Sequence, residues 1–77
     1  MRTNIPNIEH YADYIRGYDS KLAEIYGMGW EHARDKFNAD YPQGHKPANM
    51  GAYYYANGEI DALEDEINAW LNNPSQC

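Results

Sequence analysis

This chain of 77 residues has almost no cysteine and no long apolar run. Cys77 is its only cysteine, so a disulfide within the chain is excluded, and a single unpaired thiol suits a reducing compartment. No stretch approaches the roughly 20 apolar residues of a membrane-spanning helix. The first ten residues also lack the apolar run of a secretory signal. We therefore expect a cytoplasmic protein.

Basic residues are absent from residue 48 onward, and this absence sets the charge distribution. The five acidic residues of this region fall between 59 and 66, whereas the first 46 residues carry seven acidic and six basic residues. Nearly all of the formal net charge of -6 therefore lies on one segment. Such a surface repels nucleic acid and anionic membranes and attracts basic proteins. We expect no direct binding of nucleic acid or membrane.

The hydrophobic pattern predicts an all-α fold, a small three-helix bundle that forms a single domain over residues 1–77. Apolar residues at three- and four-residue spacing, separated by glycine and proline, indicate helices over residues 6–26, 30–39 and 47–72, with Gly27 ending the first. We expect the two long helices to pack antiparallel, with the short middle helix capping one end. The residues expected to be among the most buried are Ile15, Leu22, Phe37, Ile60, Leu63 and Ile67.

The last helix is predicted to have two different faces. Its core side carries Ile60, Leu63, Ile67, Trp70 and Leu71. Its outer side is expected to be solvated and acidic, with a ridge of small residues formed by Gly51, Gly58, Ala62 and Ala69. Such a ridge favours a docking surface or a homodimer contact, and the ring of Trp70 is a second candidate for the dimer contact. A solvated face that tolerates glycine is the simpler alternative.

The residues form no catalytic or metal-binding motif. His10 lies three residues before Asp13, and His32 lies three before Asp35, but neither pair matches a motif of two histidine ligands on one helix face. Ser20 falls within a predicted helix, and no glycine-rich phosphate loop follows a strand. We therefore expect no enzyme activity, no metal site and no cofactor.

The acidic face of the last helix is the leading candidate for a binding site. The predicted partner-binding residues are Tyr54, Tyr55, Glu59, Asp61, Glu64, Asp65 and Glu66. No motif links the chain to a known family, but in size, acidity and surface aromatics it is similar to small acidic proteins with which viruses of bacteria block host machinery. Some of those proteins mimic the phosphates of nucleic acid. This resemblance implies a phage-encoded inhibitor, of anti-defence or DNA-mimic type, that binds a basic nucleic-acid-handling complex in the bacterial cytoplasm.

A second hypothesis is a homo-oligomeric protein that sequesters a small anionic or nucleotide-like ligand. Basic residues concentrate around the second helix and the loop that follows it, where aromatic rings could stack on a ligand. The candidate ligand-binding residues are Trp30, Arg34, Lys36, Tyr41, His45 and Lys46. The same bases are equally placed to pair with the acidic third helix, and this pairing is the simpler expectation.

Overall fold

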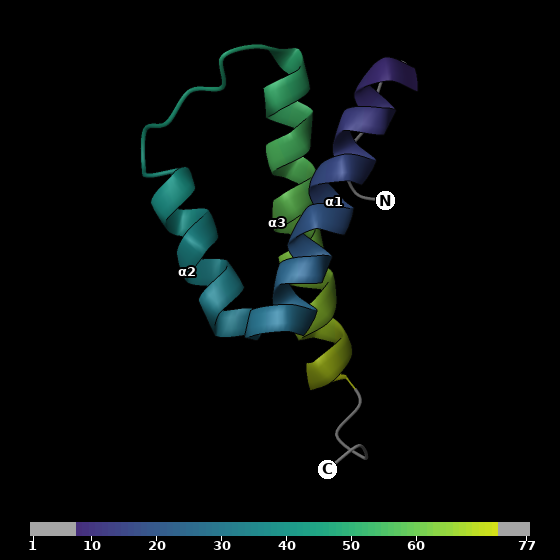
Figure 1. Ribbon diagram of the computed structural model, residues 1–77, viewed down its shortest axis with the longest axis vertical. Helices are drawn as coiled ribbons and strands as arrows, with labels where there is room; N and C mark the ends of the chain where they lie inside the picture. Colours follow the sequence, from purple (N-terminus) through teal and green to yellow (C-terminus); the bar gives the residue numbers. More distant parts are fainter. Residues whose placement is uncertain (1–7, 73–77) are drawn as a thin grey trace.

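The computed structural model describes residues 8–72, and this part of the chain forms three α-helices. α1 spans Ile8–Met28, α2 spans Trp30–Asp40 and α3 spans Met50–Leu71 (Figure 1). The prediction of an all-α fold with two long helices and a shorter middle helix is confirmed. Residues 6 and 7, where we expected the first helix to begin, lie outside the described residues.

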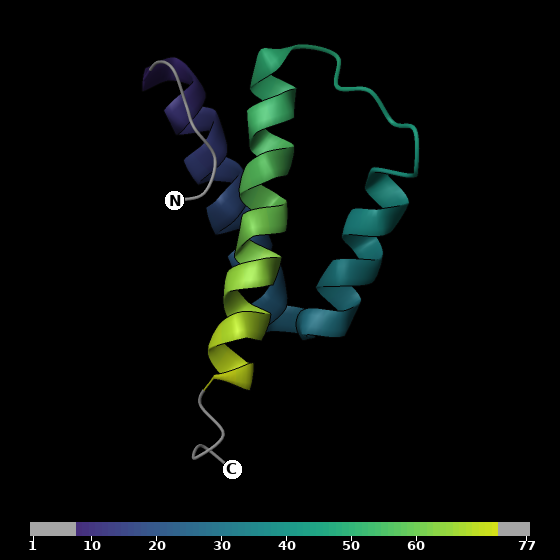
Figure 2. The same cartoon turned by 180° about the vertical axis from the view of Figure 1, so that it is seen from behind.

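The two long helices pack against each other but run in the same direction, so the predicted antiparallel packing is wrong. Tyr14 of α1 bonds Asp61 of α3, and one turn further along both helices Tyr18 bonds Asp65. Only parallel helices give this register. α2 runs back alongside them, and residues 41–49 then lead the chain across to the beginning of α3 (Figures 1 and 2). The middle helix is therefore a return crossing and not a cap.

We call the interface between α1 and α3 the seam. Glycines form its closest contacts. A Cβ atom at Gly17 would lie 2.0 Å from the carbonyl oxygen of Tyr55, and one at Gly58 would lie 2.1 Å from that of Tyr14. The two backbones thus touch, which only residues without a Cβ allow. Ala62, one turn beyond Gly58, is also fully buried. The predicted ridge is therefore no free docking or dimer surface at Gly58 and Ala62, because the fold already buries it there.

The apolar core lies where α2 meets the two long helices. It consists of Ile25, Ala33 and Leu63, against which Trp30, Phe37 and Ile60 pack. Among the residues expected to be most buried, only Leu63 is buried, and the others are half-buried: Ile15, Leu22, Phe37, Ile60 and Ile67. Trp70 and Leu71, also expected in the core, are exposed. The physical reason is that tyrosine, glycine and alanine fill the seam in place of large aliphatic side chains.

The helix ends are defined by two residues other than those predicted. Gly29, and not Gly27, separates α1 from α2: its φ of 97° lies in a region that other residues rarely adopt. α3 begins at Met50, later than predicted, because Asn49 is its N-cap. The Asn49 side chain accepts a hydrogen bond from the backbone N–H of Ala52 at 2.8 Å.

Candidate interaction surface

Two tyrosine–carboxylate pairs join α1 to α3 along the seam. The Tyr14 hydroxyl donates to Asp61 Oδ2 at 2.6 Å, and the Tyr18 hydroxyl donates to Asp65 Oδ2 at 2.7 Å. Asp61 is only 6% exposed, and a carboxylate so deeply buried requires hydrogen-bond donors because its desolvation is costly. The expectation that Asp61 belongs to a solvated outer face is therefore wrong. This residue is part of the contact between the two helices.

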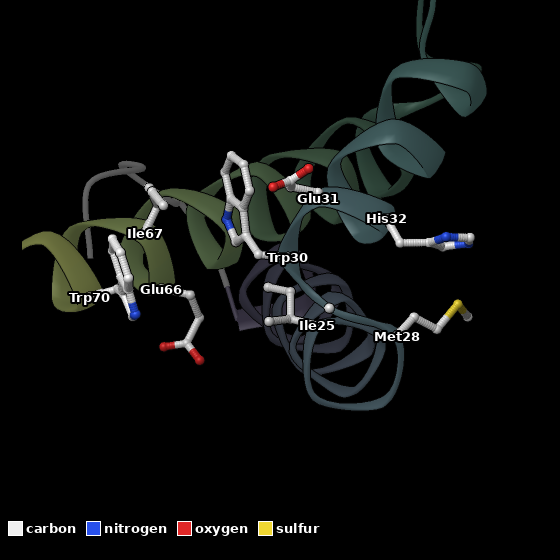
Figure 3. Close-up of a pocket in the computed structure, with 9 residues that line it drawn as sticks. Ile25, Met28, Trp30, Glu31, His32, Glu66, Ile67 and Trp70 are labelled. Carbon is white, nitrogen blue, oxygen red and sulfur yellow. The ribbon is translucent and has the colours of Figure 1, made fainter. Parts of the chain in front are cut away.

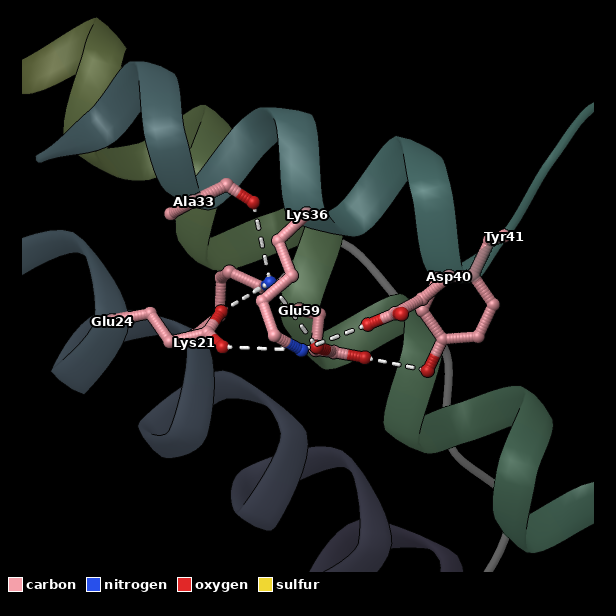
Figure 4. A network of polar contacts seen from close by, with 7 residues as sticks. All are labelled: Lys21, Glu24, Ala33, Lys36, Asp40, Tyr41 and Glu59. Atoms are coloured by element: carbon pink, nitrogen blue, oxygen red, sulfur yellow. Dashed lines mark hydrogen bonds and ion pairs between the residues drawn. The ribbon is translucent and has the colours of Figure 1, made fainter. Parts of the chain in front are cut away.

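Glu59 is likewise buried, in a polar network that joins all three helices (Figure 4). Lys21 is fully buried, and its Nζ lies 3.4 Å from Glu59 Oε2 and 2.5 Å from Glu24 Oε1. Lys21 also donates to the Ala33 carbonyl at 3.3 Å, and the Tyr41 hydroxyl donates to Glu59 Oε1 at 2.7 Å. The expectation of a solvated Glu59 is wrong, because this carboxylate forms a buried ion pair with Lys21.

The network shifts the pKa values of two of its members. The hydrogen bond from Lys21 lowers the pKa of Glu24, although partial burial of the carboxyl group acts in the opposite direction. Burial, together with the hydrogen bond to Glu59, raises the pKa of Tyr41 well above its usual value of 10.0. Glu24 is therefore charged and Tyr41 protonated throughout the neutral pH range.

Lys21 is the member of this network that the sequence analysis missed. Because its side chain is charged, a prediction based on hydrophobicity assigns Lys21 to the solvent-exposed side of the helix. It nevertheless recurs at helical spacing with the other buried residues of α1, which are Tyr14, Gly17 and Ile25. A glycine and a tyrosine at helical spacing with this lysine were the available signal. The apolar spacing over residues 6–26 outweighed it, although it includes Ile8 and Tyr26, which are exposed in the structure.

The predicted partner-binding residues do not form one surface. Tyr54 is buried and stacks on His10, with ring centroids 4.9 Å apart, and Tyr55 is half-buried. With Glu59 and Asp61 also buried, the accessible acids of the prediction are confined to the C-terminal half of α3. We call them the α3 acidic segment, which consists of Glu64, Asp65 and Glu66; Glu64 is exposed and the other two are half-buried.

The residues proposed for anion binding are spread over both ends of α2. Trp30 is the first residue of this helix and Tyr41 follows its last, so their backbone positions are roughly 16 Å apart along the helix axis. Tyr41 contacts the ring of His45 edge-on at 5.2 Å, and Lys46 is exposed in the loop that follows. Trp30 instead lies under Arg34, whose guanidinium is 5.3 Å from the ring centroid. The structure therefore does not bring the six residues into a single pocket.

The bases of α2 pair with carboxylates of α1 and α2. Arg34 Nη2 lies 2.9 Å from Asp35 Oδ1, and Lys36 Nζ lies 3.1 Å from Asp40 Oδ2 and 3.5 Å from Glu24 Oε2. The expectation that these two bases pair with the third helix is wrong for this reason. Within residues 8–72, the ion pair shown between a base and an acid of α3 is that of Lys21 with Glu59.

A groove lies where the C-terminal ends of α1 and α3 meet the start of α2 (Figure 3). We call it the tryptophan groove, because both tryptophans of the chain line it. Its volume is about 630 Å³. The Trp30 indole N–H donates to the carbonyl of Leu63 at 2.8 Å, which holds that ring in place. The side chains around the groove are apolar at Ile25, Met28, Trp30, Ile67 and Trp70, and polar at Glu31, His32 and Glu66.

The surroundings of the tryptophan groove combine exposed apolar side chains with negative charge. Large apolar residues exposed at this end of the molecule are Tyr26, Met28, Trp70 and Leu71. The carboxylate of Glu66 raises the pKa of the Tyr26 hydroxyl. Among the described residues, no lysine or arginine lines the groove.

Within residues 8–72, no group of three or more histidine, cysteine, aspartate or glutamate side chains is placed to hold a metal ion. None of the three described helices is long and apolar enough to cross a membrane. No protein-family model matches the chain, and comparisons with curated proteins and with solved structures find no match.

Proposed function

We propose that this protein is an acidic, non-catalytic interaction protein that binds a basic protein partner through the C-terminal half of α3. In this proposal the partner belongs to a nucleic-acid-handling complex, and the bound protein acts as an inhibitor because it covers the basic surface of that complex. The observation that supports the proposal most directly is the concentration of five acidic residues, and no basic residue, in the segment that forms α3.

Two carboxylates of α3 contribute to the contact with α1. Asp61 and Asp65 accept hydrogen bonds from the hydroxyls of Tyr14 and Tyr18, which are uncharged donors. Lys21 pairs with Glu59, whereas the bases of α2 pair with acids of α1 and α2. Since the last 30 residues carry five acidic residues and no base, the formal charge of α3 itself is strongly negative.

An excess of negative charge on an exposed helix end favours basic partners. Complementary charge raises the rate of encounter and disfavours acidic competitors, including nucleic acid itself. Surfaces that bind nucleic acid are rich in lysine and arginine because phosphate contacts dominate their affinity. The α3 acidic segment can compete for such a surface without any catalytic group.

The proposal is tested by removing charge from α3 with little change in side-chain shape. In the variant E64Q/D65N/E66Q the amide oxygens still accept hydrogen bonds, including the one from Tyr18, but three negative charges are lost. A matched control removes three charges from exposed acids of α1 and α2, in the variant E9Q/D19N/D35N. Both variants start from the same formal net charge of -6, so they differ only in where the charge is removed.

Each protein is immobilised and crosslinked to its partners in a nuclease-treated bacterial lysate, at low and at high salt, and the captured proteins are identified by mass spectrometry. We expect a basic nucleic-acid-handling protein to be captured by the wild type and the control but lost with the α3 variant. Capture should also weaken at high salt, because salt screens exposed charges. Equal capture by the α3 variant would refute the proposal.

A further inference from the structure

We infer that the tryptophan groove is the docking site for a basic amphipathic helix of the protein partner. The helix places a large apolar side chain between Trp30 and Trp70, and its lysine or arginine residues lie near Glu31 and Glu66. This inference rests on the proposed function, since it names the surface that holds the partner and the chemistry of the segment that binds there.

The shape of the groove suits an inserted side chain. Its volume of about 630 Å³ lies within the range of pockets that bind ligands. Trp30 projects between Ile25 of α1 and the α3 residues Ile67 and Trp70, so that all three helices contribute apolar surface (Figure 3). Because the hydrogen bond to Leu63 holds Trp30, part of this surface is already ordered before a partner binds.

The exposed apolar residues around the groove are typical of an interaction surface. Trp70 is 67% exposed and Met28 is 54% exposed, although both line the groove. Single exposed apolar residues are ordinary, but a group of them beside an apolar groove is typical of an interaction site. Tryptophan and methionine are also residues enriched at the centres of protein interfaces.

Charge complementarity selects the occupant. Glu31 and Glu66 border the groove, and no described lysine or arginine lines it, so a ligand that carries basic residues is favoured over an anionic ligand or lipid. A second copy would bring the carboxylates of both chains together between two proteins of net charge -6. Residues 73–77 of the chain contain neither a base nor a large apolar side chain, so they lack the required chemistry.

A helix matches these requirements in a way that an extended segment does not. Successive residues of a strand point to opposite sides, whereas residues three and four positions apart on a helix share a face. One face of a helix can therefore hold an apolar anchor with bases one turn before and after it. Helices that bind in apolar grooves use anchors at this spacing.

The test uses two synthetic helical peptides of about 18 residues, or five turns. Both have the same leucine face, and their polar face consists of lysine in one peptide and glutamate in the other. Neither contains an aromatic residue, so intrinsic fluorescence comes from the protein, and both of its tryptophans line the groove. We expect the lysine peptide to change the fluorescence with a dissociation constant on the order of 10 μM, and the glutamate peptide to bind at least about tenfold more weakly.

Three variants test whether the peptide binds in the groove. Trp70→Ala should weaken binding of the lysine peptide by about tenfold, while Trp30 still reports it; the fold should survive because Trp70 is largely exposed. Met50→Ala is the matched control, since Met50 is 51% exposed at the opposite end of α3, and binding should be unchanged. The double variant E31Q/E66Q should reduce the preference for lysine over glutamate peptide.

Three results would overturn the inference: equal binding of the two peptides, unchanged binding by Trp70→Ala, or no fluorescence change with the lysine peptide at about millimolar concentration. A dimer in sedimentation equilibrium that Trp70→Ala converts to a monomer would assign the groove to a second copy instead. The proposed function fails independently. A lysate partner that is lost with E64Q/D65N/E66Q but retained by Trp70→Ala would support that function and refute the groove as its site.

Discussion

Replacing Gly58 by alanine tests whether the seam depends on direct backbone contact. The added Cβ would lie 2.1 Å from the carbonyl oxygen of Tyr14 and 2.8 Å from the backbone nitrogen of Tyr18. Cβ atoms in proteins are essentially never closer than 3.0 Å to such atoms. Both neighbours are backbone atoms of α1 and cannot rotate away, so α1 and α3 would have to separate by roughly 1 Å at this point.

A separation of this size outweighs the gain in helix propensity. Alanine is favoured over glycine in a helix by up to about 1 kcal/mol. A gap of roughly 1 Å, in contrast, removes a quarter to a half of the dispersion energy of the contacts that it opens, and overpacking of this kind costs about 1–3 kcal/mol or more. It would also stretch the hydrogen bonds of Asp61 and Asp65 across the seam. We expect Gly58→Ala to lower the free energy of unfolding by about 2 kcal/mol.

The assay is urea unfolding followed by helical circular dichroism, with Gly27→Ala as the matched control. Gly27 lies within α1, and an added Cβ there would meet nothing within 4 Å. The same substitution should therefore leave stability unchanged or raise it by up to about 1 kcal/mol. If Gly58→Ala were as stable as the wild type, direct contact of the two backbones at this glycine would be refuted.

Three further predictions concern the polar network and the binding site. Lys21→Met should lower the free energy of unfolding by about 3–5 kcal/mol, because it leaves the buried carboxylate of Glu59 without its cation, and urea unfolding measures this loss. The raised pKa of Tyr41 means that the folded protein holds this proton more tightly than the unfolded chain. Its stabilising contribution should therefore be complete below pH 10 and be lost as the pH rises further, with a smaller loss in Tyr41→Phe, as urea midpoints at neutral and alkaline pH would show. The variant R34A/K46A should capture the same lysate partner as the wild type, whereas loss of capture would favour sequestration of an anionic ligand over the proposed function.

The helices could be predicted from the sequence because their signals are local. Apolar spacing, together with glycine and proline between segments, placed all three to within a few residues. The direction of the long helices could not be predicted in this way. It depends on whether the middle helix runs back along the two long helices or covers the end of the bundle. Nothing in the sequence of the middle helix decides between these two arrangements.

The burial of the acidic residues escaped prediction for a different reason. Tyr14 and Tyr18 are four residues apart, as are Asp61 and Asp65, so the matching spacing is present in the sequence. It becomes meaningful only once parallel helices bring the two pairs into register. The hydrophobic pattern also assigns tyrosine and glycine a low weight, although here they fill the interface between the two long helices. The tryptophan groove is formed by three helix ends and has no signal in any one segment.

The parallel arrangement of α1 and α3 also dictates how the chain can fold. The residues of each tyrosine–carboxylate pair are 47 positions apart in the sequence. Two antiparallel helices can zip together from the short loop between them, but here α2 and both connections must be placed before either pair forms, and the entropy of closing this loop is lost first. A fragment that contains α1 and α2 alone would lack Asp61 and Asp65, the α3 acceptors of Tyr14 and Tyr18. Folding is therefore expected to be slower than for a simple helical hairpin, and to join all three helices in one cooperative step.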